Sequence, residues 1–269
     1  MTRFVHLTDI HISHPAMEDP QRRADTAAHL RAAVEGINRL DPAPDFVLLS
    51  GDLVNHGDEP SYRLARELLA PLKAPLLIGL GNHDDRAVFH SVFSGHDRAD
   101  PMVHEAVHGG LHVVTLDSLV PGRVGGALPS EQVEFLEAAL ARHPEMPKVV
   151  SIHHPPRLSH RGLPWASLDP ESTAALAGAL AGRNVAGVFS GHIHLNRVSL
   201  WRGAPLVVSN GLNTSVDVLA DPDMVIVEGA GFALCDWNAE EGLTALFVPL
   251  APERRVLGTL SIDRLRSFA

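Results

Sequence analysis

The chain has 269 residues, of which 45% are hydrophobic and 20% are charged, and its formal net charge is -10 at pH 7. This length and composition are typical of one large globular domain with a well-buried core. The acidic balance opposes general binding to duplex nucleic acid or to anionic membranes, so a negatively charged partner needs a local source of positive charge.

Neither a secretion signal nor a membrane span is evident in the sequence. The chain starts with MTR and runs directly into FVHLTD, and it has no stretch of about 20 apolar residues. Its single cysteine, Cys235, lies in the apolar run FALCDW, where we expect a core residue and no disulfide. We therefore expect a cytoplasmic protein with no membrane span.

Apolar runs alternate with helix-period segments along most of the chain. Buried strands are predicted, in chain order, at 4–7, 46–50, 75–80, 112–116, 148–152, 185–190 and 205–209. Helices are predicted at 22–40, 61–72, 130–143 and 169–182. The last of these opens with Asp169 and Pro170, a typical helix start. Strands that alternate with helices predict a layered α/β fold.

The last part of the chain has a different pattern. From about 210 to 249 the runs are strand-like, with glycines between them and no helix period. We expect antiparallel sheet added to the α/β body. Because no linker or repeat divides the chain, we predict one domain over 1–269, with a catalytic core at 1–209 and a C-terminal β-rich extension at 210–269.

Five of the predicted strands end in residues that can bind metal ions. These residues are Asp9, His11, Asp52, Asn82, His83, Asp84, His153, His154, His192 and His194. The carboxyl ends of strands in an open α/β sheet line the ligand crevice. Any one residue has a structural alternative, such as a turn role for Asp52, but chance would have to repeat the same placement five times.

The spacing of these residues suits metal binding. In an extended segment Asp9 and His11 project to the same side, and His192 and His194 have the same relation. Glycines at 51, 81 and 191 allow tight backbone turns beside them. Imidazole and carboxylate ligands together favour Zn, Fe or Mn over Mg. Since the ligands outnumber those of one tetrahedral ion, we expect two divalent ions.

The order Asp-x-His, Gly-Asp, Gly-Asn-His-Asp, His, Gly-His-x-His over positions 9–194 resembles the calcineurin-like metallophosphoesterase superfamily. The resemblance implies a four-layer αββα sandwich. It implies one ion held by Asp9, His11 and His194, a second held by Asn82, His153 and His192, and Asp52 bridging both. It also implies that His83 is not a ligand but a catalytic group that faces the substrate.

The loop after Asp52 narrows the substrate class. Asn55 and His56 stand where the protein Ser/Thr phosphatases carry an Asp and an Arg. Without this Arg a dianionic monoester loses its bidentate clamp, which favours a monoanionic phosphodiester. Two ions offset by Asp9, Asp52 and one hydroxide leave a local charge of about +1, which attracts such a diester.

The wider motifs at 81–86 and 153–156 are similar to the class III cyclic-nucleotide phosphodiesterases, a branch that also contains glycerophosphodiesterases. This implies hydrolysis of small-molecule 3',5'-cyclic nucleotides by in-line attack of metal-activated hydroxide, with His83 protonating or hydrogen-bonding the leaving group. Glycerophosphodiesters or phosphonate esters are the alternative substrates. The branch also implies a homodimer or larger homo-oligomer, with the C-terminal strands as a lid or an interface.

Further residues are assigned supporting roles. Asn55, His56, Asn82, His83 and His194 are candidates for substrate contact. His154 is expected to support its neighbour rather than to bind metal, while Asp84 and Asp85 are expected at a helix N-terminus and as acceptors that support the ligands. A non-catalytic metal-binding scaffold is the alternative of another class, although such scaffolds typically lose ligands and all eight motif positions are filled here. A nuclease is disfavoured because the chain is acidic.

Overall fold

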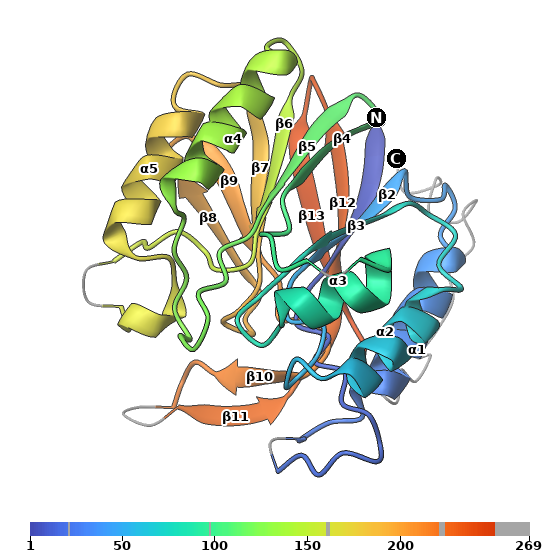
Figure 1. Cartoon of the computed structure of the whole chain (residues 1–269). Helices are drawn as coiled ribbons and strands as arrows, with labels where there is room; N and C mark the ends of the chain where they lie inside the picture. The colour runs from blue at the N-terminus through green and yellow to red at the C-terminus, as the bar shows by residue number, and fades with distance from the viewer. Residues whose placement is uncertain (21, 97, 160–161, 221–223, 251–269) are drawn as a thin grey trace, which may run out of the picture.

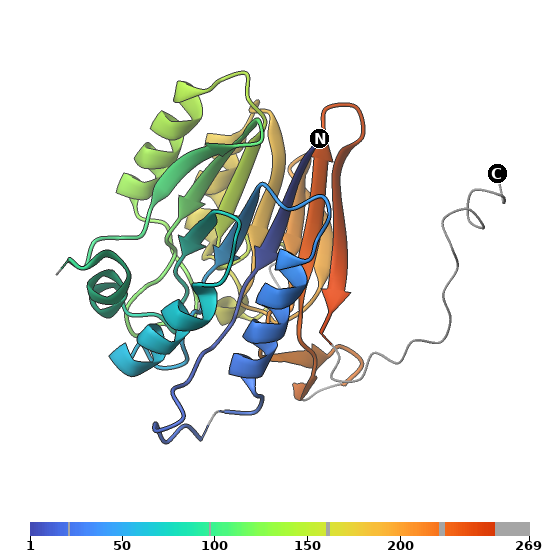
Figure 2. The ribbon, with the colours of Figure 1, turned by 90° about the vertical axis from the view of Figure 1, so that its right-hand side faces the viewer.

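Two β-sheets packed face to face form the centre of the structure, and helices cover the outer face of each sheet (Figures 1 and 2). The computed structural model describes residues 1–20, 22–96, 98–159, 162–220 and 224–250. The part of the predicted C-terminal extension from 251 to 269 therefore lies outside the described residues. No helix in these ranges is long and apolar enough to cross a membrane.

The first sheet has the strand order β13-β12-β1-β2-β3. Its strands are β1 (Thr2–Leu7), β2 (Phe46–Ser50), β3 (Leu76–Gly79), β12 (Gly231–Asn238) and β13 (Gly242–Pro249). The first three are parallel, whereas β12 and β13 extend the sheet in antiparallel pairing. The helices of this half are α1 (Thr26–Asn38), α2 (Glu59–Leu69) and α3 (Arg86–Ser94).

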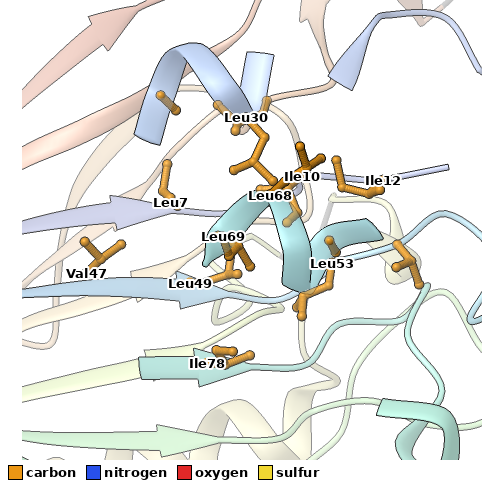
Figure 3. Close-up of a cluster of buried hydrophobic side chains, with 14 of the residues drawn as sticks. Leu7, Ile10, Ile12, Leu30, Val47, Leu49, Leu53, Leu68, Leu69 and Ile78 are labelled. Carbon is orange, nitrogen blue, oxygen red and sulfur yellow. The ribbon is translucent and has the colours of Figure 1, made fainter. Parts of the chain in front are cut away.

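Apolar side chains join these helices to the first sheet. Leu7, Leu49 and Ile78 point from the three parallel strands toward Leu30 of α1 and Leu68 of α2 (Figure 3). All five are buried, and burying such a side chain contributes about 1.5–3 kcal/mol. This packing fixes the strands whose carboxyl ends carry the predicted ligands.

The second sheet has the strand order β4-β5-β6-β7-β9-β8. Its strands are β4 (His104–His108), β5 (Leu111–Leu116), β6 (Lys148–Ile152), β7 (Val185–Ser190), β8 (Arg197–Trp201) and β9 (Ala204–Val208). Strands β5, β6, β7 and β9 are parallel to one another, whereas the edge strands β4 and β8 pair antiparallel with β5 and β9. Helices α4 (Ser130–Arg142) and α5 (Pro170–Leu180) pack on its outer face.

Aromatic side chains join the inner faces of the two sheets. Phe4 of β1 stacks on Phe46 of β2 with ring centroids 4.8 Å apart, and it meets Phe189 of β7 edge to face at 5.2 Å. All three side chains are fully buried. The layer order is therefore helix, sheet, sheet, helix, which confirms the predicted αββα sandwich.

A separate two-stranded sheet, β10 (Thr214–Asp217) and β11 (Val225–Glu228), lies at the lower end of the view in Figure 1, below the two large sheets. The C-terminal region is thus antiparallel, as predicted, but it divides between two places. Strands β12 and β13 complete the first sheet through the pairing of β12 with β1, and only β10 and β11 stand apart from the two large sheets.

The seven predicted strands and four predicted helices are present, with bounds shifted by a few residues. Asp169 caps α5 by accepting from the backbone of Ser172, as its position before Pro170 predicts. Cys235 is a buried free thiol in β12. The edge strands β4 and β8 were not predicted, because both are partly exposed and carry polar residues. Of helix α3, which is short, only the start at Asp84 and Asp85 was predicted.

Candidate metal centre

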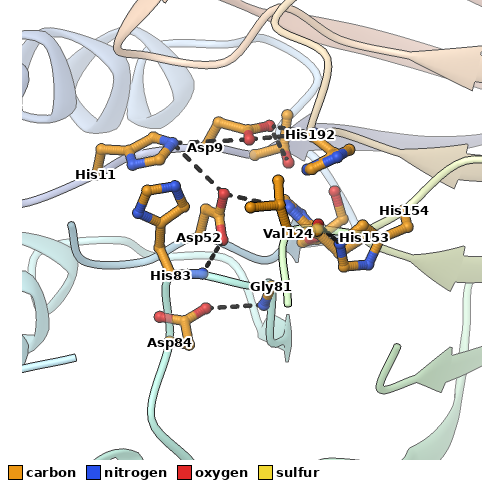
Figure 4. A network of polar contacts seen from close by, with 12 residues as sticks. Asp9, His11, Asp52, Gly81, His83, Asp84, Val124, His153, His154 and His192 are labelled. Carbon is orange, nitrogen blue, oxygen red and sulfur yellow. Dashed lines mark hydrogen bonds and ion pairs between the residues drawn. The ribbon is translucent and has the colours of Figure 1, made fainter. Parts of the chain in front are cut away.

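The predicted ligands converge at one edge of the sandwich, although they come from segments far apart in the sequence. Asp9, Asp52 and Asn82 follow strands β1, β2 and β3 of the first sheet. His153 and His192 follow β6 and β7 of the second sheet. Figure 4 shows these segments meeting around Asp52. The face-to-face sheets thus bring two sets of strand ends to one place, as the strand order predicts.

The backbone at the ligands is not extended. Among the described residues, six non-glycine residues have positive φ, and five of them are predicted ligands: Asp9 (49°), His11 (40°), Asp52 (52°), His192 (72°) and His194 (50°). The expectation that Asp9 and His11 alternate along an extended segment is therefore wrong, because β1 ends at Leu7 and the chain turns after it. Strained backbone of this kind costs about 1–3 kcal/mol per residue and concentrates at functional sites.

Glycines allow the close approach of these loops. A Cβ at Gly51, where φ is +110°, would lie 2.7 Å from Nδ1 of His153. A Cβ at Gly81 would lie 2.7 Å from the Asp52 backbone nitrogen. Since real Cβ atoms do not approach other atoms so closely, any larger residue would separate the loops.

The first group of predicted ligands is Asp9, His11 and His194. Nε2 of His194 lies 3.3 Å from Oδ1 of Asp9, and Nε2 of His11 lies 3.8 Å from the same oxygen. The two Nε2 atoms are 3.2 Å apart. Three potential ligand atoms therefore face one point, within 4.8 Å of one another.

The second group is Asn82, His153 and His192. Oδ1 of Asn82 and Nε2 of His153 are buried, and neither has a hydrogen-bond partner among the described residues. Asp52 lies between the groups, since its Oδ2 is 3.2 Å from Nε2 of His153 and 3.5 Å from Nε2 of His11. The carboxylate thus has the position that a bridging ligand requires.

Hydrogen bonds to backbone carbonyls fix the orientation of several imidazoles. Nδ1 of His153 lies 2.9 Å from Ser50 O, and Nδ1 of His194 lies 3.1 Å from Thr214 O. Nε2 of His192 lies 2.7 Å from Trp165 O. Each ring donates one N–H to a carbonyl, so its other nitrogen points away from that carbonyl and can bind a cation once it is deprotonated.

His154 is oriented differently from these rings. Its Nδ1 lies 2.7 Å from the Ser118 hydroxyl, and its Nε2 lies 2.9 Å from Val124 O. Both nitrogens already have partners, although the residue is near His153 and His192. This arrangement supports the prediction that His154 positions its neighbours and is not a ligand.

Burial and neighbouring charges set the protonation of the centre. Burial, assisted by the charge of His153, lowers the pKa of His192 to about 4, and burial also lowers the pKa of His11. Burial opposes the charge on His153 as well, but the Asp52 carboxylate outweighs it and raises the pKa of His153 to about 9. Burial alone would raise the pKa of Asp52, yet the charge of His153 holds it well below its usual range. The position beside Asp52 therefore strongly stabilises a positive charge.

The donor set fits two divalent cations. An unpaired buried acceptor costs about 1–3 kcal/mol, so Asn82 Oδ1 indicates a partner other than a protein group. Neutral imidazoles, carboxylates and one amide oxygen are ligands that Zn, Fe and Mn accept.

His83 lies beside the first group with its side chain half-buried. Its backbone N–H donates to Oδ1 of Asp52 at 2.9 Å, and its ring is 4.7 Å from the ring of His11. Nδ1 of His83 lies 2.9 Å from Asn55 O, and Nε2 takes no part in this hydrogen bond. The imidazole is therefore held at the centre by a bond that does not use Nε2.

Asp84 holds the loops beneath the centre together. Its carboxylate accepts from the backbone N–H groups of Leu53 and Gly81 and from the hydroxyl of Tyr62. Burial, followed by the charge of Asp52, raises the pKa of Asp84 to about 7. The next residue, Asp85, caps α3, so both acidic residues have the supporting roles that were predicted.

Asn55 and His56 were predicted as substrate contacts. The Asn55 side chain is buried, with its Oδ1 3.1 Å from Nδ1 of His11 and its Nδ2 donating to Asp19 at 2.8 Å. His56 is more exposed, and its Nε2 also lies 3.0 Å from Asp19. The structure thus directs the Asn55 side chain toward a predicted ligand, while a substrate contact for His56 stays a prediction.

Sequence reasoning missed several groups that orient the ligands. Trp165, Thr214 and Ser50 act through backbone carbonyls, which every residue possesses, so no sequence signal could have identified them. Asp19 lies in a loop without secondary structure, ten residues beyond Asp9. Its role depends on the path of that loop.

Comparison with known proteins identifies similar chains. Residues 2–196 match the family described as calcineurin-like phosphoesterase. A probable cyclic nucleotide phosphodiesterase from Rhodopseudomonas palustris is 35% identical over 237 residues, which are 81% of this chain and 82% of that protein. A probable glycerophosphodiester phosphodiesterase from Arcobacter nitrofigilis is 26% identical over 89% of this chain and 90% of that protein.

Among solved structures, a dimetal phosphatase from Danio rerio has a similar fold. The TM-score is 0.62 at 15% sequence identity, and the match covers 93% of this chain and 99% of that chain. At this identity the likeness supports the fold alone.

Proposed function

Because the chain belongs to the calcineurin-like phosphoesterase family, we propose that it is a metal-dependent phosphodiesterase that hydrolyses 3',5'-cyclic nucleotides. The observation that carries the proposal is the position of Asp52 between two groups of ligand atoms, each built from strand ends of both sheets. A relative named as a cyclic nucleotide phosphodiesterase matches over most of both chains.

The proposed ligand set has two halves joined by Asp52. Asp9, His11 and His194 would hold one ion, and Asn82, His153 and His192 the other. Two bound divalent ions supply Lewis acidity and a nucleophile near neutral pH by lowering the pKa of water. We propose Mn, Fe or Zn, because the set mixes imidazole nitrogen with oxygen ligands.

The protein's own groups would orient and protonate the substrate. His83 is proposed to act with both ring nitrogens protonated, so that Nδ1–H donates to Asn55 O while Nε2–H transfers its proton to the leaving oxygen. Asn55 is proposed to orient His11 through Nδ1. Asn82 contributes a neutral ligand, so the centre keeps the positive charge that attracts an anionic ester.

A diester fits the loop after Asp52 better than a monoester does. The side chain of Asn55 is bonded to His11 and Asp19, and this loop carries no guanidinium that could clamp a dianion. Glycerophosphodiesters are the second candidate class, supported by the relative from Arcobacter nitrofigilis. Both classes would use the same ligands, so the groups beyond phosphorus decide between them.

The test is a substrate panel on protein loaded separately with Mn, Fe or Zn and analysed for metal content. We expect hydrolysis of cAMP and cGMP with a larger kcat/KM than that of glycerophosphoethanolamine. The reverse order would favour the glycerophosphodiesterase alternative. If fully loaded protein hydrolysed no diester, including bis(p-nitrophenyl) phosphate, the non-catalytic scaffold would replace the proposal.

We also propose that the chain is a homodimer or larger homo-oligomer through the strands β10 and β11. Val218, Leu219 and Met224 between these strands are 71%, 88% and 58% exposed, and an isolated two-stranded sheet is marginally stable in water. Light scattering should give a multiple of the 28.9 kDa chain mass, and Leu219→Asp should shift it toward the monomer. A monomeric mass for the unmodified protein would contradict the proposal.

A further inference from the structure

An exposed tryptophan lies at the rim of the metal centre. Trp165 belongs to the short 3-10 helix Pro164–Ala166 and is 38% exposed. Its carbonyl accepts from His192, and the indole is 6.0 Å from the imidazole of His192 with an interplanar angle of 78°. Such an edge-to-face contact covers at most one face of the indole. More than a third of the residue thus remains exposed beside a predicted ligand.

The position of Trp165 is fixed by a second loop that packs against it. A Cβ at Gly125 would lie 3.3 Å from the Trp165 Cα, so the two backbones are in close contact. Gly126 and Leu168 form an isolated bridge, in which Gly126 donates to the carbonyl of Ser167 at 3.3 Å. Two contacts therefore fix Trp165: its carbonyl accepts from His192, and its backbone packs against the loop at Gly125.

The same loop adds a second apolar group to the rim. Val124 is 53% exposed, and its carbonyl lies 2.9 Å from Nε2 of His154. The ring of His154 is 4.4 Å from that of His192, so the backbone of Val124 is linked through His154 to the imidazole that Trp165 contacts. Trp165 and Val124 thus offer exposed apolar surface that a bound molecule can contact.

This rim lies across the centre from the predicted acid. His83 donates its backbone N–H to Oδ1 of Asp52, whereas His153, whose ring is 5.3 Å from that of His192, contacts Oδ2. Figure 4 shows His83 and His192 on different sides of Asp52. In a 3',5'-cyclic nucleotide one ribose carries both ester oxygens and the base, so the base extends from the side of the leaving oxygen and meets Trp165 where the ribose spans the centre.

We propose that the indole of Trp165 stacks on the nucleobase of the substrate and makes the enzyme prefer nucleotide diesters to glycerol diesters. The proposal rests on the proposed function. Every base has a π face, so stacking is tolerant of base identity and predicts similar use of cAMP and cGMP. A glycerol-based diester has no ring and gains nothing from this contact.

The test compares Trp165→Ala and Trp165→Phe with the unmodified protein at equal metal content. Loss of stacking is expected to raise KM for cAMP by about 5- to 100-fold with little change in kcat, while the Phe variant retains most of the affinity. The kcat/KM for glycerophosphoethanolamine should fall much less than that for cAMP, because this substrate has no base to stack. Leu200→Ala, which removes an 80% exposed side chain from β8, is the matched surface control.

Competitive inhibition by 5'-AMP and ribose 5-phosphate isolates the contribution of the base. Trp165→Ala should weaken inhibition by AMP and leave inhibition by ribose 5-phosphate unchanged. Equal weakening of both inhibitors, or an unchanged KM for cAMP, would overturn the stacking proposal while cAMP hydrolysis by the unmodified protein still supported the proposed function. Failure of the unmodified protein to hydrolyse any cyclic nucleotide would instead refute the proposed function.

Discussion

Replacing His83 by Ala tests whether this residue is an acid or a metal ligand. Among the described residues, the imidazole makes one hydrogen bond, from Nδ1 to Asn55 O, and it lies 4.7 Å from the ring of His11. The bond to Asp52 comes from the backbone N–H of residue 83 and survives the substitution. The change therefore removes Nε2 from the centre without removing any of the seven proposed ligands.

The expected loss depends on the leaving group. A positioned general acid contributes about 10²- to 10⁴-fold, which corresponds to roughly 3–5 kcal/mol of transition-state stabilisation. Hydrolysis of cAMP expels a sugar alkoxide, a poor leaving group that needs a proton, so the full loss in kcat is expected. Bis(p-nitrophenyl) phosphate expels a stabilised phenolate, and its hydrolysis should fall by only about tenfold or less.

The assay measures kcat for both substrates on His83→Ala and on His83→Gln, together with metal content by elemental analysis. The Gln variant can donate a hydrogen bond but cannot transfer a proton readily, so it should resemble Ala on cAMP. His96→Ala, which truncates an exposed histidine after α3, is the control. An equal loss on both substrates would refute proton donation, and loss of bound metal would make His83 a ligand.

Three further predictions test the ligands, their support and the core. Asp52→Asn removes the charge between the two ligand groups, so the metal content should fall from about two ions per chain to one or none. A variant that retains two ions would contradict the bridging role. Asn55→Ala removes the partner of Nδ1 of His11 and should weaken metal binding about 10- to 100-fold in a chelator competition, whereas an unchanged affinity would exclude this orienting role. Phe4→Ala opens the contact with Phe189 between the sheets and should lower the free energy of unfolding by about 3–5 kcal/mol in urea. A loss below about 1 kcal/mol would mean that the sheets close around the gap.

Much of the fold could be predicted because its signals are local. Each buried strand is a short apolar run, and each predicted helix has an apolar stripe, so chain order alone defines the α/β pattern. The ends of the strands carry their donors within a few residues, as at Asp9 and Asp52. The joining of β12 to β1 was not predictable in detail, because the pairing connects residues more than 220 positions apart.

The sequence by itself determined which residues are available as ligands, because Asp, His and Asn follow strand ends in a specific order. Only the tertiary structure decided how they are arranged. The left-handed backbone at Asp9 and His11, the pairing of His154 with Ser118 and the exposed indole of Trp165 depend on loops that meet in space. Backbone carbonyls and loop paths carry no residue-type signature, so long-range packing, and not local pattern, fixes the orientation of each group in the centre.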